Sequence, residues 1–321
     1  MASGSSILIT GGAGFIGSHL LDRLLPDNDV TVLDNFSSGK RERLAGYMGR
    51  SNFRLIEADL LQADALPEAL AGKDMVFHLA ANPDVRLGAL DPSVHLRQNI
   101  MATHNLLEAM RRAKVKKIAF TSTSTVYGEA KQIPTPEEYG PLLPISLYGA
   151  SKLACEALIS SYCHTFDMQA WIYRFANIVG ERGSHGVLVD FIRKLRENPA
   201  ELEILGSGRQ KKSYLEVKDC VEAMLLCLQA SDEMVSLFNI GSEDSVDVTE
   251  IADIVVRQMG LKDVSYRYTG GDEGRGWKGD VRVMLLSLEK IKGLGWRAKG
   301  GSAQAIQSAV EALLRDGSSG S

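Results

Sequence analysis

Tyr148 and Lys152 stand four residues apart in the sequence SLYGASK, within a stretch whose apolar residues recur with helical spacing. Residues four apart lie on the same face of a helix, so the phenol and the ammonium can act together. A tyrosine with an ordinary pKa of about 10 is a poor base at neutral pH. A neighbouring positive charge stabilises the phenolate and lowers that pKa, which lets the tyrosine take a proton from a hydroxyl group.

A row of five hydroxyl residues, TSTST at 121–125, ends an apolar run that is typical of a buried strand. A hydroxyl beside a catalytic tyrosine can hold a substrate hydroxyl and assist the transfer of its proton. Hydroxyls at a strand end can equally bond to nearby backbone groups. The row alone leaves open which of these hydroxyls takes part in chemistry and which hold structure.

A glycine-rich turn, GGAGFIG, lies between the first predicted strand and a predicted helix. Gly11, Gly14 and Gly17 let the backbone turn tightly and approach a pyrophosphate, whose charge lies at the helix N-terminus. Asp34 ends the second strand, where a carboxylate accepts the hydroxyls of the adenine ribose and repels a 2′-phosphate. The pattern predicts a dinucleotide cofactor, and Asp34 favours NAD over NADP. Asp59 is a candidate partner for the adenine, or a helix N-cap.

Apolar runs of strand length alternate with helical patterns through the first half of the chain. Near-continuous apolar strands separated by helices indicate a parallel sheet covered on both faces. Strands are predicted at 7–10, 30–34, 53–59, 75–81, 116–123 and 169–175, and helices at 14–25, 92–113 and 147–165. The pattern predicts a doubly wound α/β protein. A Rossmann-type domain would span residues 6–175, with elements returning from about 213–240, and a smaller C-terminal α/β substrate lobe would span 176–316.

Composition argues against several classes of protein. Of 321 residues, 45% are hydrophobic and 24% are charged, and the formal net charge of −4 disfavours a nucleic-acid surface. No apolar run approaches the roughly 18–20 residues of a membrane span, and the N-terminus lacks the pattern of a secretory signal. The cysteines and histidines have no common metal-ligand spacing, so no metal site is predicted. A cytoplasmic protein with small-molecule partners is expected.

Taken together, the glycine turn, the sequence HLAA at 78–81, the hydroxyl strand and the pair Tyr148 and Lys152 resemble the extended short-chain dehydrogenase/reductase family. Within it the chain is most similar to NAD-dependent nucleotide-sugar epimerases, and among these to UDP-glucose 4-epimerases. The resemblance runs from about Ile7 to Trp296. It implies a bound NAD, a UDP-sugar substrate and a homodimer formed through the helices at 92–113 and 147–165.

The resemblance also implies a role for each matching residue. Thr123 would hold the reacting 4-hydroxyl of the sugar and assist proton transfer to Tyr148, and Lys152 would complete the catalytic set. Tyr148 and Lys152 would also contact the cofactor. The remaining implied NAD-binding residues are Gly11, Gly14, Phe15, Ile16, Gly17, Asp34, Asn35, Asp59, Leu60, Leu79, Ala80, Ala81, Asn99 and Ser122.

The second half of the chain resembles the sugar-nucleotide segments of the family, with two departures. Lys212 and Trp277 each stand where the family has an arginine. A lysine offers charge to a diphosphate but no bidentate fork, so the diphosphate contact is expected to shift to Arg275. Asp280 would hold the uridine ribose. The implied substrate-binding residues are Thr123, Asn177, Val187, Leu188, Lys212, Arg275 and Asp280.

The two positions after Thr123 separate the reactions of this family. Dehydratases carry an Asp-Glu pair there and UDP-glucuronate decarboxylases keep a glutamate at the second position, whereas this chain has Ser124 and Thr125. Epimerisation needs no such carboxylates because it removes and returns one hydride. The expected function is NAD-dependent epimerisation at C4 of UDP-glucose and UDP-galactose, through a 4-keto sugar. A UDP-glucuronate decarboxylase, another nucleotide-sugar reductase or epimerase of the same family, and a non-catalytic NAD-sensing protein stay open as alternatives.

Overall fold

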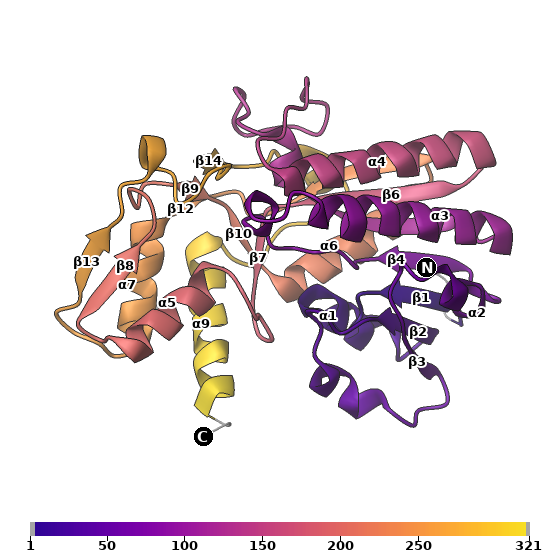
Figure 1. Cartoon of the computed structure of the whole chain (residues 1–321), viewed down its shortest axis with the longest axis horizontal. Coiled ribbons are helices and arrows are strands. Elements are labelled where there is room, and N and C mark those ends of the chain that lie inside the picture. Colours follow the sequence, from indigo (N-terminus) through magenta and orange to yellow (C-terminus); the bar gives the residue numbers. More distant parts are fainter. Residues whose placement is uncertain (1–3, 319–321) are drawn as a thin grey trace. The chain divides into compact units, whose positions relative to one another are not determined.

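The computed structural model describes residues 4–318 (Figure 1). The chain divides into two compact units. Unit 1 comprises Met1–Val126, Leu147–Arg174 and Met224–Phe238, and unit 2 comprises Tyr127–Ser146, Phe175–Ala223 and Asn239–Ser321. Residues 127–146, which the sequence analysis placed in the first domain, therefore cluster with unit 2.

A seven-stranded sheet forms the framework of unit 1. Its strands follow the order β11-β6-β5-β4-β1-β2-β3. β1 pairs in parallel with both β2 and β4, so that Ile9 lies beside Val32 on one side and Phe77 on the other. The strands are β1 Ser6–Thr10, β2 Asp29–Asp34, β3 Phe53–Glu57, β4 Met75–His78, β5 Lys117–Thr123, β6 Gln169–Phe175 and β11 Val235–Ile240.

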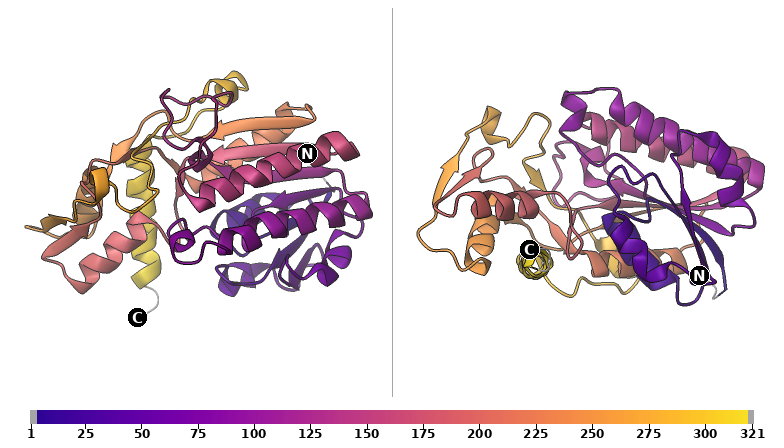
Figure 2. Two further views of the ribbon diagram at one scale, coloured as in Figure 1. Left: turned by 45° about the horizontal axis from the view of Figure 1, so that its top comes forward. Right: turned by 60° about the horizontal axis from the view of Figure 1, so that its bottom comes forward.

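Helices cover both faces of this sheet. The strand order reverses between β1 and β4, so right-handed crossovers in the two directions place their helices on opposite faces. α3 (Ala102–Ala113) and α4 (Leu147–Phe166) lie side by side on one face with the short α2 (Leu66–Leu70), and α1 (Phe15–Leu24) covers the other (Figures 1 and 2). The predicted doubly wound parallel sheet is confirmed.

The apolar core of unit 1 explains why these helices settle on the sheet. Leu8 and Phe120 from the strands pack with Leu106 of α3 and Ile159 of α4, and all four are almost completely buried. Each fully buried side chain of this size contributes roughly 1.5–3 kcal/mol relative to exposure. The core thereby fixes α4 against β5, the two elements that carry the hydroxyl row and the Tyr148–Lys152 pair.

The structure differs from the predicted elements where the chain leaves the regular pattern. β4 ends at His78 instead of residue 81, because the Ala80 amide turns to the Thr10 hydroxyl at 3.3 Å. The predicted helix at 92–113 begins at Val94 and passes through a π-helical turn, Leu96–Met101, before α3. β11 lies next to β6 at the edge of the sheet, within the segment 213–240 for which the sequence analysis gave no separate strand.

Unit 2 is built from short strands and helices around a core of its own. Helices α5, α7 and α9 contribute Phe191, Ile251 and Ile306 to one buried cluster. Its small sheets pair β7 with β10, β8 with β13, and β9 with both β12 and β14. The helix α6 contributes residues to both units. The elements are β7 Asn177–Val179, α5 Val187–Glu197, β8 Glu201–Ile204, β9 Lys211–Lys212, β10 Tyr214–Glu216, α6 Val217–Ala230, β12 Val246–Asp247, α7 Val248–Gln258, β13 Ser265–Tyr268, β14 Val283–Met284, α8 Glu289–Gly293 and α9 Ser302–Ser318.

Among the helices described, none has both the length and the apolar character needed to cross a membrane. The four cysteines lie on helices α4 and α6, and they are buried thiols that form no disulfide with one another.

The loop between β1 and α1 requires glycine at two positions. Gly11 has a φ of +73°, and a Cβ there would lie 2.7 Å from the backbone nitrogen of Ala80. A Cβ on Gly17 would lie 2.3 Å from the carbonyl oxygen of Gly11. Both obstacles are backbone atoms, so a side chain at either position would force the loop away from β4 or from the start of α1.

We expect Gly17→Ala to destabilise the protein by roughly 1–3 kcal/mol, the usual cost of overpacking. The thermal unfolding midpoint, measured by circular dichroism, should fall by several degrees. Gly46→Ala is the matched control, because a Cβ there meets nothing within 4 Å. Equal midpoints for the two variants would show that the loop can relax around the extra methyl group.

Candidate functional site

The N-terminus of α1 has no side-chain cap. Gly14 precedes the helix without a capping hydrogen bond, and Phe15 and Ile16 begin it. The Gly14 amide donates to the carbonyl oxygen of Gly11 at 3.0 Å, which keeps the turn tight. Backbone N–H groups at such a helix start have no partner within the helix and can donate to a phosphate.

Asp34 links the end of β2 to this glycine turn. Its Oδ2 accepts a hydrogen bond from the Ala13 amide at 2.9 Å, and its Oδ1 accepts one from the Phe36 amide at 2.8 Å. Burial raises the pKa of this carboxyl, and the two amides oppose that effect. Asp59, after β3, accepts a hydrogen bond from the Asn35 side chain at 2.9 Å. These acids lie at the carboxyl ends of neighbouring strands, the edge where open α/β sheets bind nucleotides.

Asn99 joins the loop after β4 to α4. It lies in the π-helical turn and is 2% exposed. Its Oδ1 accepts a hydrogen bond from the Asn82 amide at 2.8 Å, and its Nδ2 donates to Ser151 Oγ at 2.9 Å. The segment of Leu79, Ala80 and Ala81 is thereby held next to the helix that carries Tyr148.

The first turns of α4 carry Tyr148 and Lys152. The Lys152 side chain is 3% exposed, and its Nζ donates to the carbonyl oxygen of Thr121 at 2.7 Å. The same ammonium lies 4.5 Å from the centre of the Phe120 ring, a cation–π contact. The ring of Tyr148 meets the ring of His95 edge-on, with 5.6 Å between their centres. The structure thus brings Lys152 directly to the hydroxyl strand, with Tyr148 one helical turn earlier.

Thr123 is the last residue of β5. Its Oγ1 accepts hydrogen bonds from the amide and from the hydroxyl of Thr125, both at 3.2 Å. A hydroxyl oxygen whose lone pairs accept two bonds still has its own proton to donate to a further partner. Thr125 therefore orients Thr123, a relation that the sequence analysis did not predict.

Ser122 bonds to α4. Its hydroxyl donates to Oε1 of Glu156, a residue that also receives two hydrogen bonds from Arg174 at 3.0 and 2.6 Å. The sequence analysis assigned Ser122 to the cofactor, but the proton of its hydroxyl is already used in this bond.

Asn177, Val187 and Leu188 lie in unit 2. Asn177 begins β7, and its Nδ2 donates to the Ser213 carbonyl oxygen at 3.2 Å. Val187 and Leu188 begin α5 after Gly186, which has a φ of +101° and provides no side-chain cap. The side chain of Leu188 is buried in the core of unit 2. A contact between this segment and a ligand is therefore left to the backbone amides at the start of α5.

Lys212, Trp277 and Asp280 form one cluster in unit 2. Lys212 Nζ lies 2.5 Å from Asp280 Oδ1 and 5.1 Å from the centre of the Trp277 ring. Asp280 also accepts a hydrogen bond from the Gly276 amide at 3.1 Å. Trp277 Nε1, a donor, and Gln210 Oε1, an acceptor, are buried without a hydrogen-bond partner. Buried polar groups are nearly always bonded, so a ligand that offers an acceptor and a donor would complete this cluster.

Arg275 is held by several partners of its own. Its two terminal nitrogens donate to the two carboxylate oxygens of Glu129 at 2.8 and 2.9 Å. They also donate to the Asp280 carbonyl oxygen at 2.6 Å and to Glu273 at 3.1 Å. The diphosphate contact that the sequence analysis expected of Arg275 would compete with these bonds.

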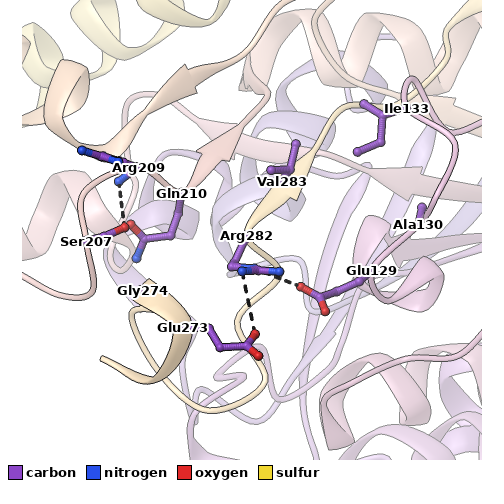
Figure 3. A pocket seen from close by; sticks show the side chains of 10 residues that line it. All are labelled: Glu129, Ala130, Ile133, Ser207, Arg209, Gln210, Glu273, Gly274, Arg282 and Val283. Carbon is purple, nitrogen blue, oxygen red and sulfur yellow. Dashed lines mark hydrogen bonds and ion pairs between the residues drawn. The ribbon is translucent and has the colours of Figure 1, made fainter. Parts of the chain in front are cut away.

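A cavity of about 590 Å³ in unit 2 shares residues with this network. Figure 3 shows Arg282 directed at two carboxylates, which lie 3.5 Å (Glu129) and 3.8 Å (Glu273) from its nitrogens. The lining residues are Glu129, Ala130, Ile133, Ser207, Arg209, Gln210, Glu273, Gly274, Arg282 and Val283. The cavity therefore presents charges of both signs, and its lining includes Gln210.

Comparison with known proteins decides the family. Residues 7–241 match the model of the NAD dependent epimerase/dehydratase family. The chain belongs to this family. A putative UDP-glucose 4-epimerase of Methanocaldococcus jannaschii is 34% identical over 299 residues, which are 91% of this chain and 92% of that protein. UDP-glucuronic acid decarboxylase 2 of Arabidopsis thaliana is 30% identical, over 92% of this chain and 65% of that protein. A solved UDP-galactose 4-epimerase, 42% identical, has a TM-score of 0.86 and covers 97% of this chain and 99% of that chain.

Membership of this epimerase/dehydratase family confirms the resemblance to extended short-chain dehydrogenases and the prediction of NAD. Structural relatives have been solved with NAD bound. The residues present fit this cofactor, because α1 begins without a side-chain cap behind a turn that excludes side chains at Gly11 and Gly17. Relatives that act on different UDP-sugars establish the chain as a nucleotide-sugar enzyme of this family without fixing the sugar.

Burial dominates the protonation of the groups around Lys152. It lowers the pKa of Lys152 to about 8 and raises that of Tyr148 above its ordinary value. It also lowers the pKa of His78 to about 3. The sequence analysis expected the Lys152 ammonium to lower the pKa of Tyr148, but in the structure burial has the larger effect. A phenolate here requires further positive charge, of the kind that an oxidised nicotinamide ring supplies.

The functional candidates that sequence reasoning missed are Thr125, His95 and the pair Glu156 and Arg174. Each acts on a predicted residue through a contact between elements far apart in the sequence or through a local turn. Of these, only Glu156 had a sequence signal, its position four residues after Lys152 on the same helix face.

Replacing Lys152 by methionine should stabilise the protein, because the ammonium is buried at a cost that lowers its pKa. The unfolded state has a lysine pKa of about 10.4 and binds more protons than the folded state between about pH 8 and that value. The gain from Lys152→Met should therefore be full below about pH 8 and decline as the pH rises toward about 10.4. Urea unfolding of both proteins from pH 6 to 10.5, at one fixed NAD concentration, measures this difference.

Lys117→Met is the control, because Lys117 is exposed at the start of β5. It shows how replacing an exposed lysine by methionine on the same strand changes the free energy of unfolding at each pH. A Lys152→Met difference with the same profile as this control would mean that the buried ammonium does not titrate as described.

Proposed function

We propose that the protein interconverts a nucleotide sugar at C4, with UDP-glucose and UDP-galactose as the preferred pair. The observation that carries this proposal is the position of Thr123 at the end of β5 and of Tyr148 and Lys152 in the first turns of α4, together with hydroxyls instead of carboxyls at 124 and 125. An enzyme that expels water or carbon dioxide needs an additional acid or base in this position. Thr125 instead spends its hydroxyl on orienting Thr123.

The residues of the chain have separate roles in this reaction. Thr123 binds the 4-hydroxyl of the sugar, and the Tyr148 phenolate takes the proton of that hydroxyl as the 4-keto sugar forms. The Lys152 ammonium stabilises the phenolate electrostatically. Bound NAD supplies the acceptor and the donor of the hydride. Rotation of the keto sugar presents its other face, and Tyr148 returns the proton to give the C4 epimer.

The proposed cofactor contacts follow the edge of the sheet in unit 1. The amides at the start of α1 hold the pyrophosphate, and Asp34 binds the adenine ribose. Asn35 and Asp59, with the adjacent Leu60, bind around the adenine. Leu79, Ala80, Ala81 and Asn99 line the path toward Tyr148 and Lys152.

The proposed substrate contacts lie in unit 2. Asn177 and Lys212 bind the diphosphate, the α5 amides at Val187 and Leu188 meet the nucleoside, and Asp280 accepts the ribose hydroxyls. A uracil base offers both carbonyl acceptors and an N–H donor. That chemistry suits the unpartnered Trp277 Nε1 and Gln210 Oε1. A homodimer and a cytoplasmic location stay predictions from the sequence.

A product assay tests the reaction. The purified protein, incubated with UDP-glucose, should produce UDP-galactose, and parallel incubations with UDP-glucuronate, UDP-N-acetylglucosamine, dTDP-glucose and GDP-mannose test the rival substrates. Thr123→Val keeps the side-chain shape and removes the hydroxyl, so kcat should fall by about 10²–10⁴-fold. Tyr148→Phe should be nearly inactive. Released nucleotide, assayed after denaturation, should be NAD in every variant.

Thr125→Val and Ser124→Ala are the matched controls for Thr123→Val. Ser124→Ala should change kcat by less than about tenfold, and Thr125→Val by an intermediate amount because it loosens Thr123 without removing its hydroxyl. Pentose product from UDP-glucuronate, or full activity in Thr123→Val, would contradict the proposed reaction.

The second test separates Lys212 from Arg275. Lys212 gives one of its three ammonium protons to Asp280, so two remain for a diphosphate, whereas Arg275 already bonds to Glu129, Glu273 and a backbone carbonyl. Losing a charge-assisted bond costs roughly 1.5–3 kcal/mol, so Lys212→Ala should raise the KM for the sugar nucleotide by about 10- to 100-fold. Arg275→Ala should raise it less.

Lys212→Arg serves as the control for charge, because it restores the arginine that the family has at this position. It should keep KM within a few-fold of the parent. If Arg275→Ala instead raises KM by 100-fold while Lys212→Ala leaves it unchanged, Arg275 makes the diphosphate contact as the sequence analysis expected.

A further inference from the structure

A buried ion pair lies beneath the catalytic end of α4. Arg174, on β6, donates to both carboxylate oxygens of Glu156, at 3.0 Å (Nε to Oε1) and 2.6 Å (Nη2 to Oε2). The two side chains are only 4% and 8% exposed. An ion pair withdrawn from water to this extent gains little net stability, because desolvation offsets the attraction. Stability alone therefore gives a weak reason for its presence.

The same carboxylate lies on the face of α4 that also carries Lys152. Glu156 follows Lys152 by one helical turn, and both belong to the buried face of α4. Ser122 on β5 donates its hydroxyl to Glu156, while its neighbour Thr121 accepts the Lys152 ammonium on its carbonyl oxygen. One carboxylate thus ties β5 to α4 beside the bond that aims the ammonium.

The other titratable groups that face Lys152 are uncharged. His78 on β4 is kept neutral, because burial lowers its pKa to about 3. Cys155 on α4 stays a thiol, because burial raises its pKa. Tyr148, on the same helix, is a neutral phenol unless further positive charge, such as that of an oxidised nicotinamide ring, lies beside it, because burial raises its pKa. Among these neighbours Glu156 is the anion, and its attraction counteracts the burial that lowers the pKa of Lys152.

We propose that Glu156, balanced by Arg174, is a positioning residue that keeps the Lys152 ammonium charged and aimed at the Thr121 carbonyl oxygen. The inference rests on the proposed role of Lys152 in catalysis. Arg174 moderates the effect, because it shares the carboxylate and draws part of its negative charge away from Lys152. With both partners present, Lys152 is more readily protonated than it would be without Glu156 and less readily than it would be without Arg174.

This arrangement predicts opposite effects for the two partners. Glu156→Gln removes the negative charge and leaves Arg174 positive, so the pKa of Lys152 should fall by about one unit or more. Arg174→Gln leaves the carboxylate to Lys152 and Ser122, so the pKa of Lys152 should rise. Both variants should lose stability, since each breaks a buried pair. A role confined to packing would lower stability in both without opposite shifts.

The titration of Lys152 can be measured without any catalytic assay. The free energy of unfolding of the full chain is compared with that of its Lys152→Met partner from pH 5 to 10.5, at one NAD concentration. The pH at which this difference begins to decline marks the pKa of Lys152 in the folded protein. It should lie near 8 in the parent, at lower pH in Glu156→Gln and at higher pH in Arg174→Gln.

The double variant Glu156→Gln with Arg174→Gln keeps the test decisive if a single variant fails to fold. It removes both charges and retains amides that can bond to each other. For this double variant, the stability difference from its Lys152→Met partner should begin to decline at a pH between the values for Glu156→Gln and for the parent. Declines at the parent pH in all variants, or shifts in the same direction for Glu156→Gln and Arg174→Gln, would overturn the proposal.

The alkaline limb of kcat/KM with UDP-glucose should follow the same order among the variants. Failure of the proposed reaction would remove this second readout but leave the unfolding measurement intact. Shifts in unfolding without turnover would uphold the link between Glu156 and Lys152 and reject only the assigned substrate.

Discussion

The ammonium of Lys152 is buried, and the protein around it must replace the hydration that it has lost. Water cannot solvate the charge, so a backbone carbonyl, an aromatic face and a nearby carboxylate replace it. Each of these partners comes from β5 or α4. The requirement fixes the register between that strand and that helix, and with it the distance from the hydroxyl row to Tyr148. The apolar core behind α4 then holds the register by packing.

The main strands and helices of unit 1 could be predicted from the sequence because each depends on a pattern of neighbouring residues. The period of the apolar residues predicted the strands and the long helices, and the glycine spacing predicted the turn before α1. Tyr148 and Lys152 were predicted to share a helix face, and α4 contains both. β11 pairs with a strand far away in the sequence, and its apolar run is too short for the periodicity to distinguish a strand from a helix.

The parts of the site that the sequence did not predict depend on contacts between distant segments. Glu156 and Arg174 meet across α4 and β6, and no spacing rule connects them. The pKa of Tyr148 was expected to fall, since a nearby lysine is visible in the sequence whereas the extent of burial is not. The engagement of Arg275 by Glu129 likewise joins residues 146 positions apart. Local sequence patterns identify candidate site residues, but burial and contacts between distant segments decide the protonation and the partners of those residues.

The π-helical turn at Leu96–Met101 has a consequence for how this chain can change in length. A π-helical turn contains one residue more than an α-helical turn. A one-residue deletion in this segment would therefore make it an ordinary α-helix that continues into α3. Each residue of an α-helix turns the chain by about 100°. Such a deletion would swing Asn99 away from Ser151 and Asn82, and His95 away from the ring of Tyr148. A change in the length of this segment therefore disrupts the contacts of Asn99 and His95 together, whereas a substitution changes one side chain and leaves the direction of the others as it is.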